Sequence, residues 1–176
     1  MTDSQKDACS LIQLRPVRRS DLDAIFVLQG DAAGNDQAAT IPRSRESFDE
    51  HWDLVLNDSS AGAYSIIVSD RLVGTIARYR MQSTDYVGYW IGPDDRGRGV
   101  ATQALCKLLK LHPERPLMAR VAVSNAASVQ VLQKNGFEIV DRYHAEATDR
   151  FLACEEYLMQ LDSLKDGRIH SDGRDQ

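Results

Sequence analysis

The sequence predicts a mixed α/β fold, with a largely antiparallel sheet of about seven strands flanked by about four helices. Strand-sized apolar or alternating runs lie between turn residues, and two segments in the second half change to helical spacing. The 176 residues, 43% hydrophobic and 27% charged, have the composition of a globular domain rather than of a disordered or fibrous protein. We expect one domain over 1–176, with its core at about 11–161 and flexible ends at 1–10 and 163–176.

The first part of the chain is expected to contain a strand and two helices. Residues 11–15 alternate between apolar and polar side chains, which suits a first strand. Ser20 begins a pattern that resembles a capping box, so a short helix is expected over 24–28. Residues 30–39 are rich in Gly, Asp, Asn and Ala and are expected to form a loop. Ser47 is expected to open the second helix.

Strands and helices then follow in an order that requires crossover connections. Asn125 is a candidate N-cap for the last helix, and Gly136 follows its end. The expected elements are strands over 63–69, 72–80 and 85–91, a helix over 100–111, a strand over 117–123, a helix over 125–135, and strands over 137–140 and 150–161.

A glycine-rich turn lies between the strand over 85–91 and the helix that follows it. Gly97 and Gly99 precede a helix that begins with small residues, so several unpaired backbone N–H groups meet at the positive end of a helix. This geometry suits a phosphate group, although a solvated glycine-capped loop has the same local pattern. The dinucleotide-binding pattern fails because Thr102 stands at its last position, and the P-loop pattern is absent.

Charge is distributed unevenly along the chain. The formal net charge of −5 argues against a general nucleic-acid binder. Between residues 96 and 110, however, there is no carboxylate and there are four cations: Arg96, Arg98, Lys107 and Lys110. Such a local excess of positive charge suits an anionic ligand.

Several classes of protein are not expected. No apolar run reaches the ~20 residues needed to cross a bilayer, and the polar first ten residues lack a signal-peptide core, so we expect a cytoplasmic protein without a membrane partner. The three cysteines form no C-x-x-C pair, and the four histidines show no ligand spacing. We therefore expect neither a disulfide framework nor a metal site.

Three segments together resemble the GCN5-related N-acetyltransferase (GNAT) superfamily. Residues 96–101, Arg-Gly-Arg-Gly-Val-Ala, fit its Arg/Gln-x-x-Gly-x-Gly/Ala signature. Residues 121–137 are similar to the N-x-x-S-x-x-V-L-x-K-x-G-F block of the ribosomal-protein alanine acetyltransferase-like branch, and residues 14–22 are similar to the first strand and helix. The resemblance covers about 11–161 and implies the GNAT fold, with a splay between the fourth and fifth strands.

The resemblance also implies acetyl-CoA as co-substrate and places it in that splay. Trp90 and Ile91 would pair their backbone with pantetheine, and Asn125 and Ser128 would lie beside the thiol end. Asn125 as a plain N-cap and Ser128 as a small packing residue are the alternatives. The residues implied in the pyrophosphate cradle are Arg96, Gly97, Arg98, Gly99, Val100, Ala101 and Thr102.

The implied reaction is direct attack of a primary amine, from a peptide N-terminus or a small molecule, on the thioester. Leu132 stands where many members carry a tyrosine acid, so Ser128 is the candidate proton donor. Tyr86 stands where many carry a glutamate base, with Asp85 beside it, and both are candidate catalytic residues. Other candidate bases are His144, Glu146 and Glu155. The alternatives are a non-catalytic acyl-CoA-binding or regulatory module and an unrelated nucleotide-phosphate binder.

The acceptor is expected to bind between residues 30–52 and the last two strands, in a monomer or a homodimer. Arg43, Arg45, His51 and Trp52 are candidate pocket residues, against the alternative of a core Trp52 and solvent-facing arginines. An α-amino group, with a pKa of ~8, loses its proton at pH 7 for about 1 kcal/mol, whereas a lysine needs about 4–5 kcal/mol. Without an evident base, the sequence favours an acceptor with a low pKa.

Overall fold

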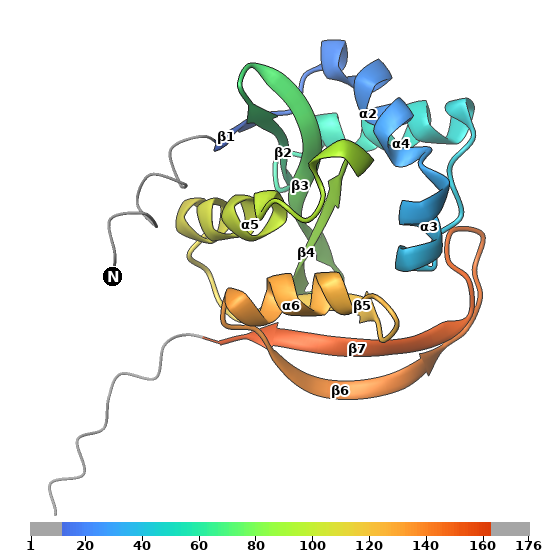
Figure 1. The fold of residues 1–176 in the computed structure, drawn as a ribbon, viewed down its shortest axis with the longest axis vertical. Helices are drawn as coiled ribbons and strands as arrows, with labels where there is room; N and C mark the ends of the chain where they lie inside the picture. Colours follow the sequence, from blue (N-terminus) through green and yellow to red (C-terminus); the bar gives the residue numbers. More distant parts are fainter. Residues whose placement is uncertain (1–11, 163–176) are drawn as a thin grey trace, which may run out of the picture.

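A computed structural model describes residues 12–162, and the ends expected to be flexible lie outside them. One seven-stranded sheet runs through the structure in the order β1-β2-β3-β4-β5-β7-β6 (Figure 1). Every neighbouring pair is antiparallel except β4 and β5. The predicted mixed α/β architecture with a largely antiparallel sheet is confirmed.

The described residues form seven strands, five α-helices and two short 3-10 helices. The strands are β1 (Ile12–Pro16), β2 (Gly62–Val68), β3 (Arg71–Met81), β4 (Thr84–Ile91), β5 (Leu117–Ala122), β6 (Glu138–Ala145) and β7 (Cys154–Leu161). The helices are η1 (Arg19–Asp21), α2 (Leu22–Gln29), α3 (Ala32–Ala38), α4 (Arg45–Asn57), η2 (Pro93–Asp95), α5 (Val100–Leu111) and α6 (Ala126–Lys134).

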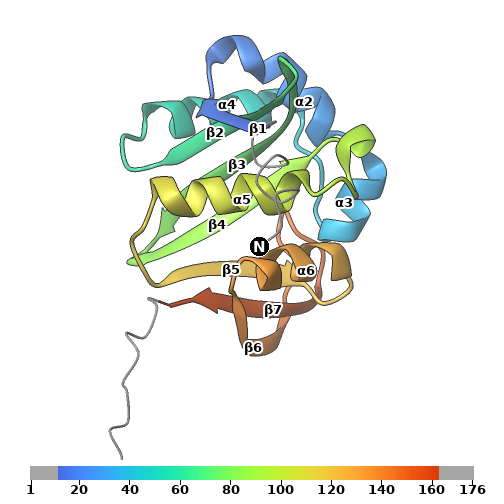
Figure 2. The same cartoon turned by 60° about the vertical axis from the view of Figure 1, so that its left-hand side comes forward.

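The splay between β4 and β5 is the feature of the sheet that matters most for the site. The two strands share a single register pair, Tyr86 with Met118, and then separate. Figure 2 shows α5 lying in front of β3 and β4, while α6 lies in front of β5. The last residues of β4 therefore have β3 on one side and no strand partner on the other.

Two apolar clusters hold helices against the opposite faces of the sheet. On the first face, α5 and α6 pack Leu105, Leu108 and Leu132 against strand residues such as Val87 and Met159. On the second face, α2 and α4 build a smaller cluster from Leu22, Ile25, Phe48 and Trp52, together with Val17. Burying each of these large side chains contributes roughly 1.5–3 kcal/mol to folding.

The prediction of a loop over 30–39 is wrong, because residues Ala32–Ala38 form α3. The Asp31 side chain caps this helix by accepting a hydrogen bond from the Gly34 amide at 2.7 Å. The Asn35 side chain donates to the carbonyl oxygens of Gln29 and Asp31. The helix has no apolar stripe, so its small polar composition resembled that of a loop.

Two predicted helix starts are also wrong. The N-cap of α4 is Ser44, whose hydroxyl accepts from the Ser47 amide at 3.2 Å, so the helix begins earlier than expected. Ser20 lies inside η1 and caps nothing, and α2 begins at Leu22. The carboxylate that organises this turn belongs to Asp21, which accepts from the Arg18 amide and pairs with Arg15.

The last hairpin differs from the prediction at both strands. β6 extends to Ala145, well past the expected end at residue 140, and β7 begins at Cys154 rather than at 150. β6 is an edge strand whose side chains are mostly exposed, so its polar second half carries no apolar alternation that would identify it.

Candidate functional site

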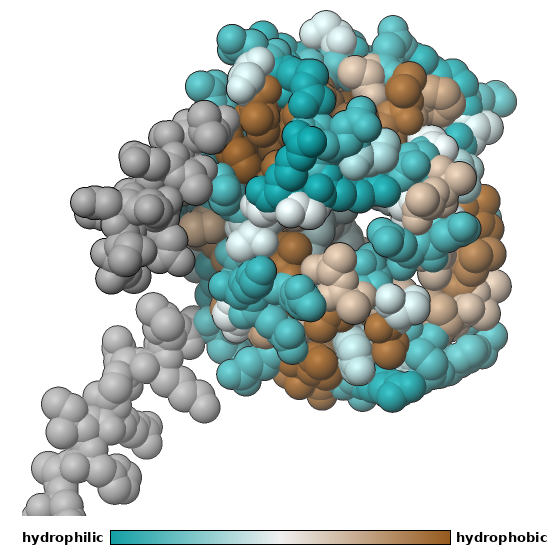
Figure 3. All heavy atoms as spheres, in the orientation of Figure 1, coloured by the Kyte–Doolittle hydropathy of each residue, from teal (hydrophilic) through white to brown (hydrophobic). Residues whose placement is uncertain are grey.

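A cleft of about 400 Å³ opens at the splayed end of the sheet, between β4, the start of α5, α6 and α3. Figure 3 shows the molecular surface hollowed at this place. Of the predicted binding residues, Arg98 is exposed and outside the lining, and the others line the cleft: Trp90, Ile91, Arg96, Gly97, Gly99, Val100, Ala101, Thr102, Asn125 and Ser128. The cleft also contains residues that sequence reasoning missed, including Gly34, Tyr89 and Lys134.

The turn before α5 is built to expose backbone N–H groups. Gly97 and Gly99 adopt φ values of 71° and 77°, in the left-handed region that glycine enters without strain. No side chain caps α5 at Gly99, whereas Asp31, Ser44 and Asn125 cap α3, α4 and α6. The first N–H groups of α5 thus point into the cleft region without an intrahelical partner, which suits a phosphate.

Arg96 fastens α3 to this turn. Its guanidinium pairs with Asp31 at 2.7 Å and donates from Nε to the Ile91 carbonyl oxygen at 3.0 Å. It also lies over the Trp90 ring, 5.9 Å from the centroid. A Cβ on Gly34 would lie 2.7 Å from Asp31 Oδ2 and 2.8 Å from Trp90 Cζ2, so α3 approaches the turn this closely because residue 34 is glycine.

The four cations between residues 96 and 110 do not form one patch. Arg96 is paired with Asp31, and Lys107 and Lys110 lie on the later turns of α5. At ~1.5 Å per residue, Lys110 is about 15 Å along the helix from its start. The local excess of charge in the sequence therefore does not converge on the cleft. Lys134, at the end of α6, contributes a lining cation from another part of the chain.

Ser128 and Tyr89 form a hydroxyl pair in the cleft. The Tyr89 Oη and Ser128 Oγ atoms are 2.7 Å apart, and Tyr89 Oη also lies 3.2 Å from the Ser128 carbonyl oxygen. Burial raises the pKa of Tyr89 to about 12, so the phenol keeps its proton at neutral pH. Asn125 Oδ1 accepts from the Ser128 amide at 3.1 Å, which confirms the predicted N-cap. Both predicted readings of Asn125 are compatible with its place in the lining.

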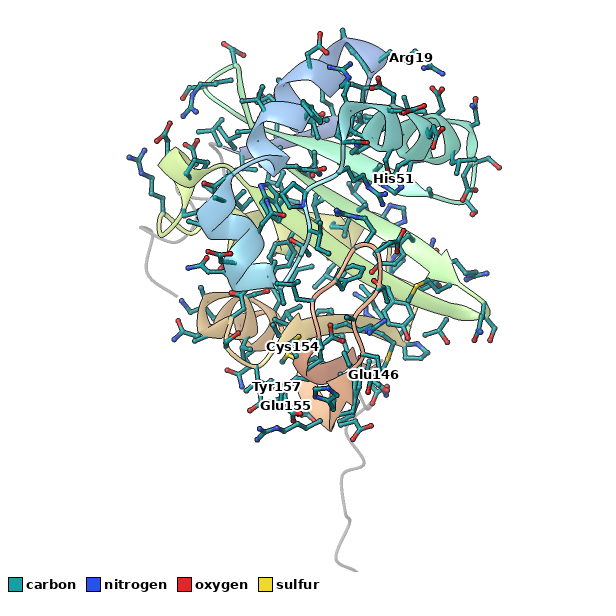
Figure 4. The ribbon with its side chains drawn as sticks, turned by 90° about the vertical axis from the view of Figure 1, so that its right-hand side faces the viewer. Arg19, His51, Glu146, Cys154, Glu155 and Tyr157 are labelled. Carbon is teal, nitrogen blue, oxygen red and sulfur yellow. The ribbon has the colours of Figure 1, made fainter. Side chains whose placement is uncertain are left out.

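A second cavity of about 330 Å³ lies on the opposite face of β4 and shares Trp90 with the first. Its lining includes Arg43 from the segment before α4, His51 from α4, and Arg150 and Phe151 from the connection between β6 and β7. Figure 4 shows His51 directed away from α4 toward that connection. The Trp90 indole donates to the Leu28 carbonyl oxygen at 2.7 Å, which holds the shared wall in place.

The predicted acceptor residues divide between this cavity and other environments. Arg43 and His51 line the cavity. Trp52 is 5% exposed and belongs to the core, and Arg45 is exposed and paired with Asp49 and Asp23. The alternative of a core Trp52 and a solvent-facing arginine is therefore confirmed for Trp52 and Arg45, whereas Arg43 and His51 are placed as pocket residues.

A family model described as an acetyltransferase (GNAT) domain matches residues 12–138. The chain belongs to the GNAT acetyltransferase family. A curated relative, the ribosomal-protein-serine acetyltransferase of Escherichia coli (strain K12), is 31% identical over 84 residues, which are 44% of this chain and 47% of the relative. The match thus spans about half the length of that relative.

Solved structures of GNAT proteins share the fold at low identity. Spermidine N-acetyltransferase from Vibrio cholerae, in complex with CoA and spermine, superposes with a TM-score of 0.75 at 18% identity, over 87% of this chain and 96% of that chain. Ribosomal-protein-alanine N-acetyltransferase from Brucella melitensis has a TM-score of 0.73 at 19% identity, over 86% of this chain and 99% of that chain. These likenesses confirm the GNAT fold.

The GNAT positions that depart from the family pattern have other roles here. Leu132 is 2% exposed and packs in the main core, outside the cleft lining. Tyr86 stacks on Tyr79 with ring centroids 5.9 Å apart and lines neither cavity. Asp85 is held between Arg78 at 2.6 Å and Arg80 at 2.8 Å. These partners lower the pKa of Asp85 to about 2, so it is a poor base, and the structure does not support its predicted catalytic role.

The other candidate bases also lie away from both cavities. Glu155 pairs with His144 and Arg142, each at 3.2 Å, on the exposed outer hairpin. Glu146 is exposed at the end of the same hairpin, and Figure 4 shows both glutamates near its edge. None of these side chains lines either cavity. Within the described residues, no helix is long and apolar enough to cross a membrane, and no group of three or more His, Cys, Asp or Glu is placed to hold a metal.

Proposed function

We propose that this protein is an acetyl-CoA-dependent N-acetyltransferase that acts on a primary amine by direct attack. The observation that carries the proposal is the uncapped start of α5, which follows two left-handed glycines and opens into a cleft at the β4–β5 splay. The family match over residues 12–138 supports the same reaction.

The cleft has groups suited to each part of the coenzyme. The N–H groups of the turn and of the first residues of α5 would bind the pyrophosphate, with Lys134 as a nearby cation. The end of β4, at Trp90 and Ile91, has no strand partner on the β5 side, so its backbone groups would pair with the pantetheine amides. Acetyl-CoA would supply the activated acyl group as a thioester.

The chemical end of the cleft is assigned to Ser128 and Tyr89. The amine nitrogen attacks the thioester carbon, the carbon–sulfur bond breaks, and the sulfur takes a proton. Ser128 Oγ would donate that proton and would be resupplied by the Tyr89 hydroxyl 2.7 Å away. The ammonium releases one proton to water before attack, which is inexpensive for an α-amino group with a pKa of ~8. The second proton, which the nitrogen loses after attack, passes to solvent, and solvent returns a proton to Tyr89.

The decisive experiment measures thiol release from acetyl-CoA with a panel of peptides, amino acids, polyamines and antibiotics as acceptors. Amine-dependent release, lost in a Gly99→Glu variant, is the expected result. The name of the curated relative, ribosomal-protein-serine acetyltransferase, supports including protein N-termini in the panel. CoA binding without turnover on any acceptor would instead favour an acyl-CoA-binding or regulatory module, a role suggested by the Leu132 and Tyr86 substitutions of the family's acid and base.

A further inference from the structure

We propose that the second cavity selects acceptor amines that also carry a negative charge, such as a carboxylate, close to the amino group. The inference rests on the proposed function and names the substrate class of the same site. Its basis is a pair of guanidinium groups, those of Arg43 and Arg150, that line the cavity and form no ion pair with a carboxylate among residues 12–162.

Arg150 has an unsatisfied donor at the cavity. Its Nη1 atom is buried and has no hydrogen-bond partner among residues 12–162. An unpartnered charged donor in such a place is costly, because its hydration is lost without a replacement. A bound anion would supply the missing acceptor.

Arg43 adds a second positive charge beside the first. Its Nη1 donates to the Ser47 hydroxyl at 3.3 Å, so its described partner is neutral. Both side chains line the same cavity. Burial lowers the pKa of both guanidiniums, and the charge of Arg43 lowers that of Arg150 further. Asp149 offsets this effect in part, but it is exposed and forms no ion pair with either arginine within the described chain.

Other partly buried arginines among the described residues have partners that Arg43 and Arg150 lack. Arg78, whose side chain is 15% exposed, pairs with Asp85, and Arg96 pairs with Asp31. Arg115 has no carboxylate partner in this part of the chain, but its guanidinium donates to the carbonyl oxygens of His112, Glu114 and Leu109. The guanidiniums at the second cavity have the Ser47 hydroxyl and the nearby charge of Asp149, so a bound anion would add a directly paired counter-charge.

The backbone holds these arginines in place rather than leaving them on a loose surface loop. The Ile41 amide donates to the Arg150 carbonyl oxygen, and the Leu152 amide donates to the Ala39 carbonyl oxygen, both at 2.8 Å. Thr40 and Phe151 form an antiparallel bridge between the same segments. The cavity wall is therefore preorganised, which reduces the entropic cost of binding.

His51 also lines this cavity but carries no charge at neutral pH. Burial, and then Arg43 and Arg150, lower its pKa to about 4. A polyamine would meet two guanidiniums whose charge Asp149 offsets only in part, so repulsion disfavours it. An amine with a carboxylate would place the anion on the arginines while Trp90, which lines both cavities, brings the ligand next to the coenzyme cleft.

The test compares kcat/KM for matched acceptors that differ in one charge. L-Isoglutamine, whose α-carboxyl is an amide, against L-glutaminamide, and the C-terminally amidated peptide Ala-Glu against amidated Ala-Gln, separate a single-residue amine from a peptide source, with spermidine as the cationic member. We expect the anionic member of at least one pair to be preferred at least tenfold, and spermidine to be the poorest acceptor. Equal or better use of the neutral or cationic amine would overturn the inference while leaving the proposed function intact.

Variants assign the preference to the two arginines. Arg150→Gln and Arg43→Gln should each reduce the charge preference at least fivefold through KM, and Arg150→Lys should retain more of it than Arg150→Gln. Arg142→Gln is the matched control, because Arg142 is exposed on β6 and lines neither cavity. A preference that survives the double variant Arg43→Gln/Arg150→Gln would contradict the assignment.

A binding measurement decides the inference even if no amine is acetylated. The NMR pKa of His51 should rise on saturation with N-acetyl-L-glutamate and not with N-acetyl-L-glutaminamide, because an anion offsets the two guanidinium charges. If acetyl-CoA binds without turnover but this shift occurs, the proposed function fails and the anion site stands. If neither compound shifts the His51 pKa, the anion site is refuted.

Discussion

The two cavities that share Trp90 present positive charge in different ways. The coenzyme cleft exposes backbone N–H groups of the turn before α5, where Arg96 is paired with Asp31 and Arg98 lies outside the lining, so its lining cation is Lys134 from α6. The second cavity exposes side-chain charges, on Arg43 and Arg150, that have no carboxylate partner in the described residues. In the function that we propose, the backbone site binds the coenzyme, whereas the side-chain site, which single substitutions can change, sets the acceptor.

The largest expected effect tests the proposal that the backbone N–H groups of the turn before α5 bind the pyrophosphate. Gly99→Glu should weaken CoA binding more than 100-fold, because it puts a negative charge and a strained φ of 77° at the phosphate seat. Isothermal titration with CoA measures the change. Gly99→Asn is the control for backbone strain, since Asn tolerates the left-handed region, and it should lose far less affinity. Unchanged affinity in Gly99→Glu would refute the placement of the pyrophosphate.

The next effect tests the chemical end of the coenzyme cleft. Ser128→Ala should lower kcat roughly 100-fold with little change in the Kd for CoA, because a positioned proton donor contributes ~10²–10⁴ to the rate. Tyr89→Phe should lower kcat about tenfold by removing the hydroxyl that supplies Ser128. Tyr157→Phe, the same change on β7 outside the cleft lining, is the control. Full activity in Ser128→Ala would show that Ser128 is a packing residue.

A smaller effect tests the charge of the second cavity through stability. His51 has a pKa of about 4 in the folded protein and ~6.5 when unfolded, so the unfolded chain binds more protons between these values. The contribution of His51 to the free energy of unfolding should therefore be fully present above pH 6.5. It should fall by ~1–2 kcal/mol as the pH drops to about 4, after allowance for the partial exposure of the side chain. Urea titrations of the wild type and of His51→Gln measure this. An equal slope in both would exclude His51 as the source.

The smallest effect concerns the cost of the unpaired guanidinium. In the absence of ligand, Arg150→Gln should raise the thermal midpoint slightly, because it removes a buried positive charge next to Arg43. Arg78→Gln is the contrasting variant and should lower the midpoint, since it leaves the largely buried Asp85 with one partner fewer. Differential scanning calorimetry distinguishes the signs. A lower midpoint in Arg150→Gln would mean that this arginine stabilises the fold.

Much of the coenzyme cleft could be predicted because its residues are close together in the chain. The turn at Gly97 and Gly99 and the capped start of α6 at Asn125 are local patterns, and the structure places both in one cleft. Sequence reasoning missed Tyr89. Strand alternation places its side chain on the face of β4 opposite to that of Trp90, and this pattern could have identified it as a second aromatic residue at the end of the strand. Its contact with Ser128 joins two elements that no local pattern connects.

The remaining features depend on contacts between distant segments. α3 has no apolar periodicity, and what holds it is its Asp31 cap and the ion pair from Asp31 to Arg96. The second cavity brings together Arg43, His51 and Arg150, which belong to separate connections and helices. Local pattern therefore sufficed for the fold class and for the glycine turn where we propose that the coenzyme binds, because hydrophobic spacing and glycine conformation act over a few residues. Sequence reasoning also offered Arg43 and His51 as pocket residues, but Arg150 and the lack of a paired carboxylate in the described residues came from the folded chain alone, because burial and counter-charge are properties of neighbours in space.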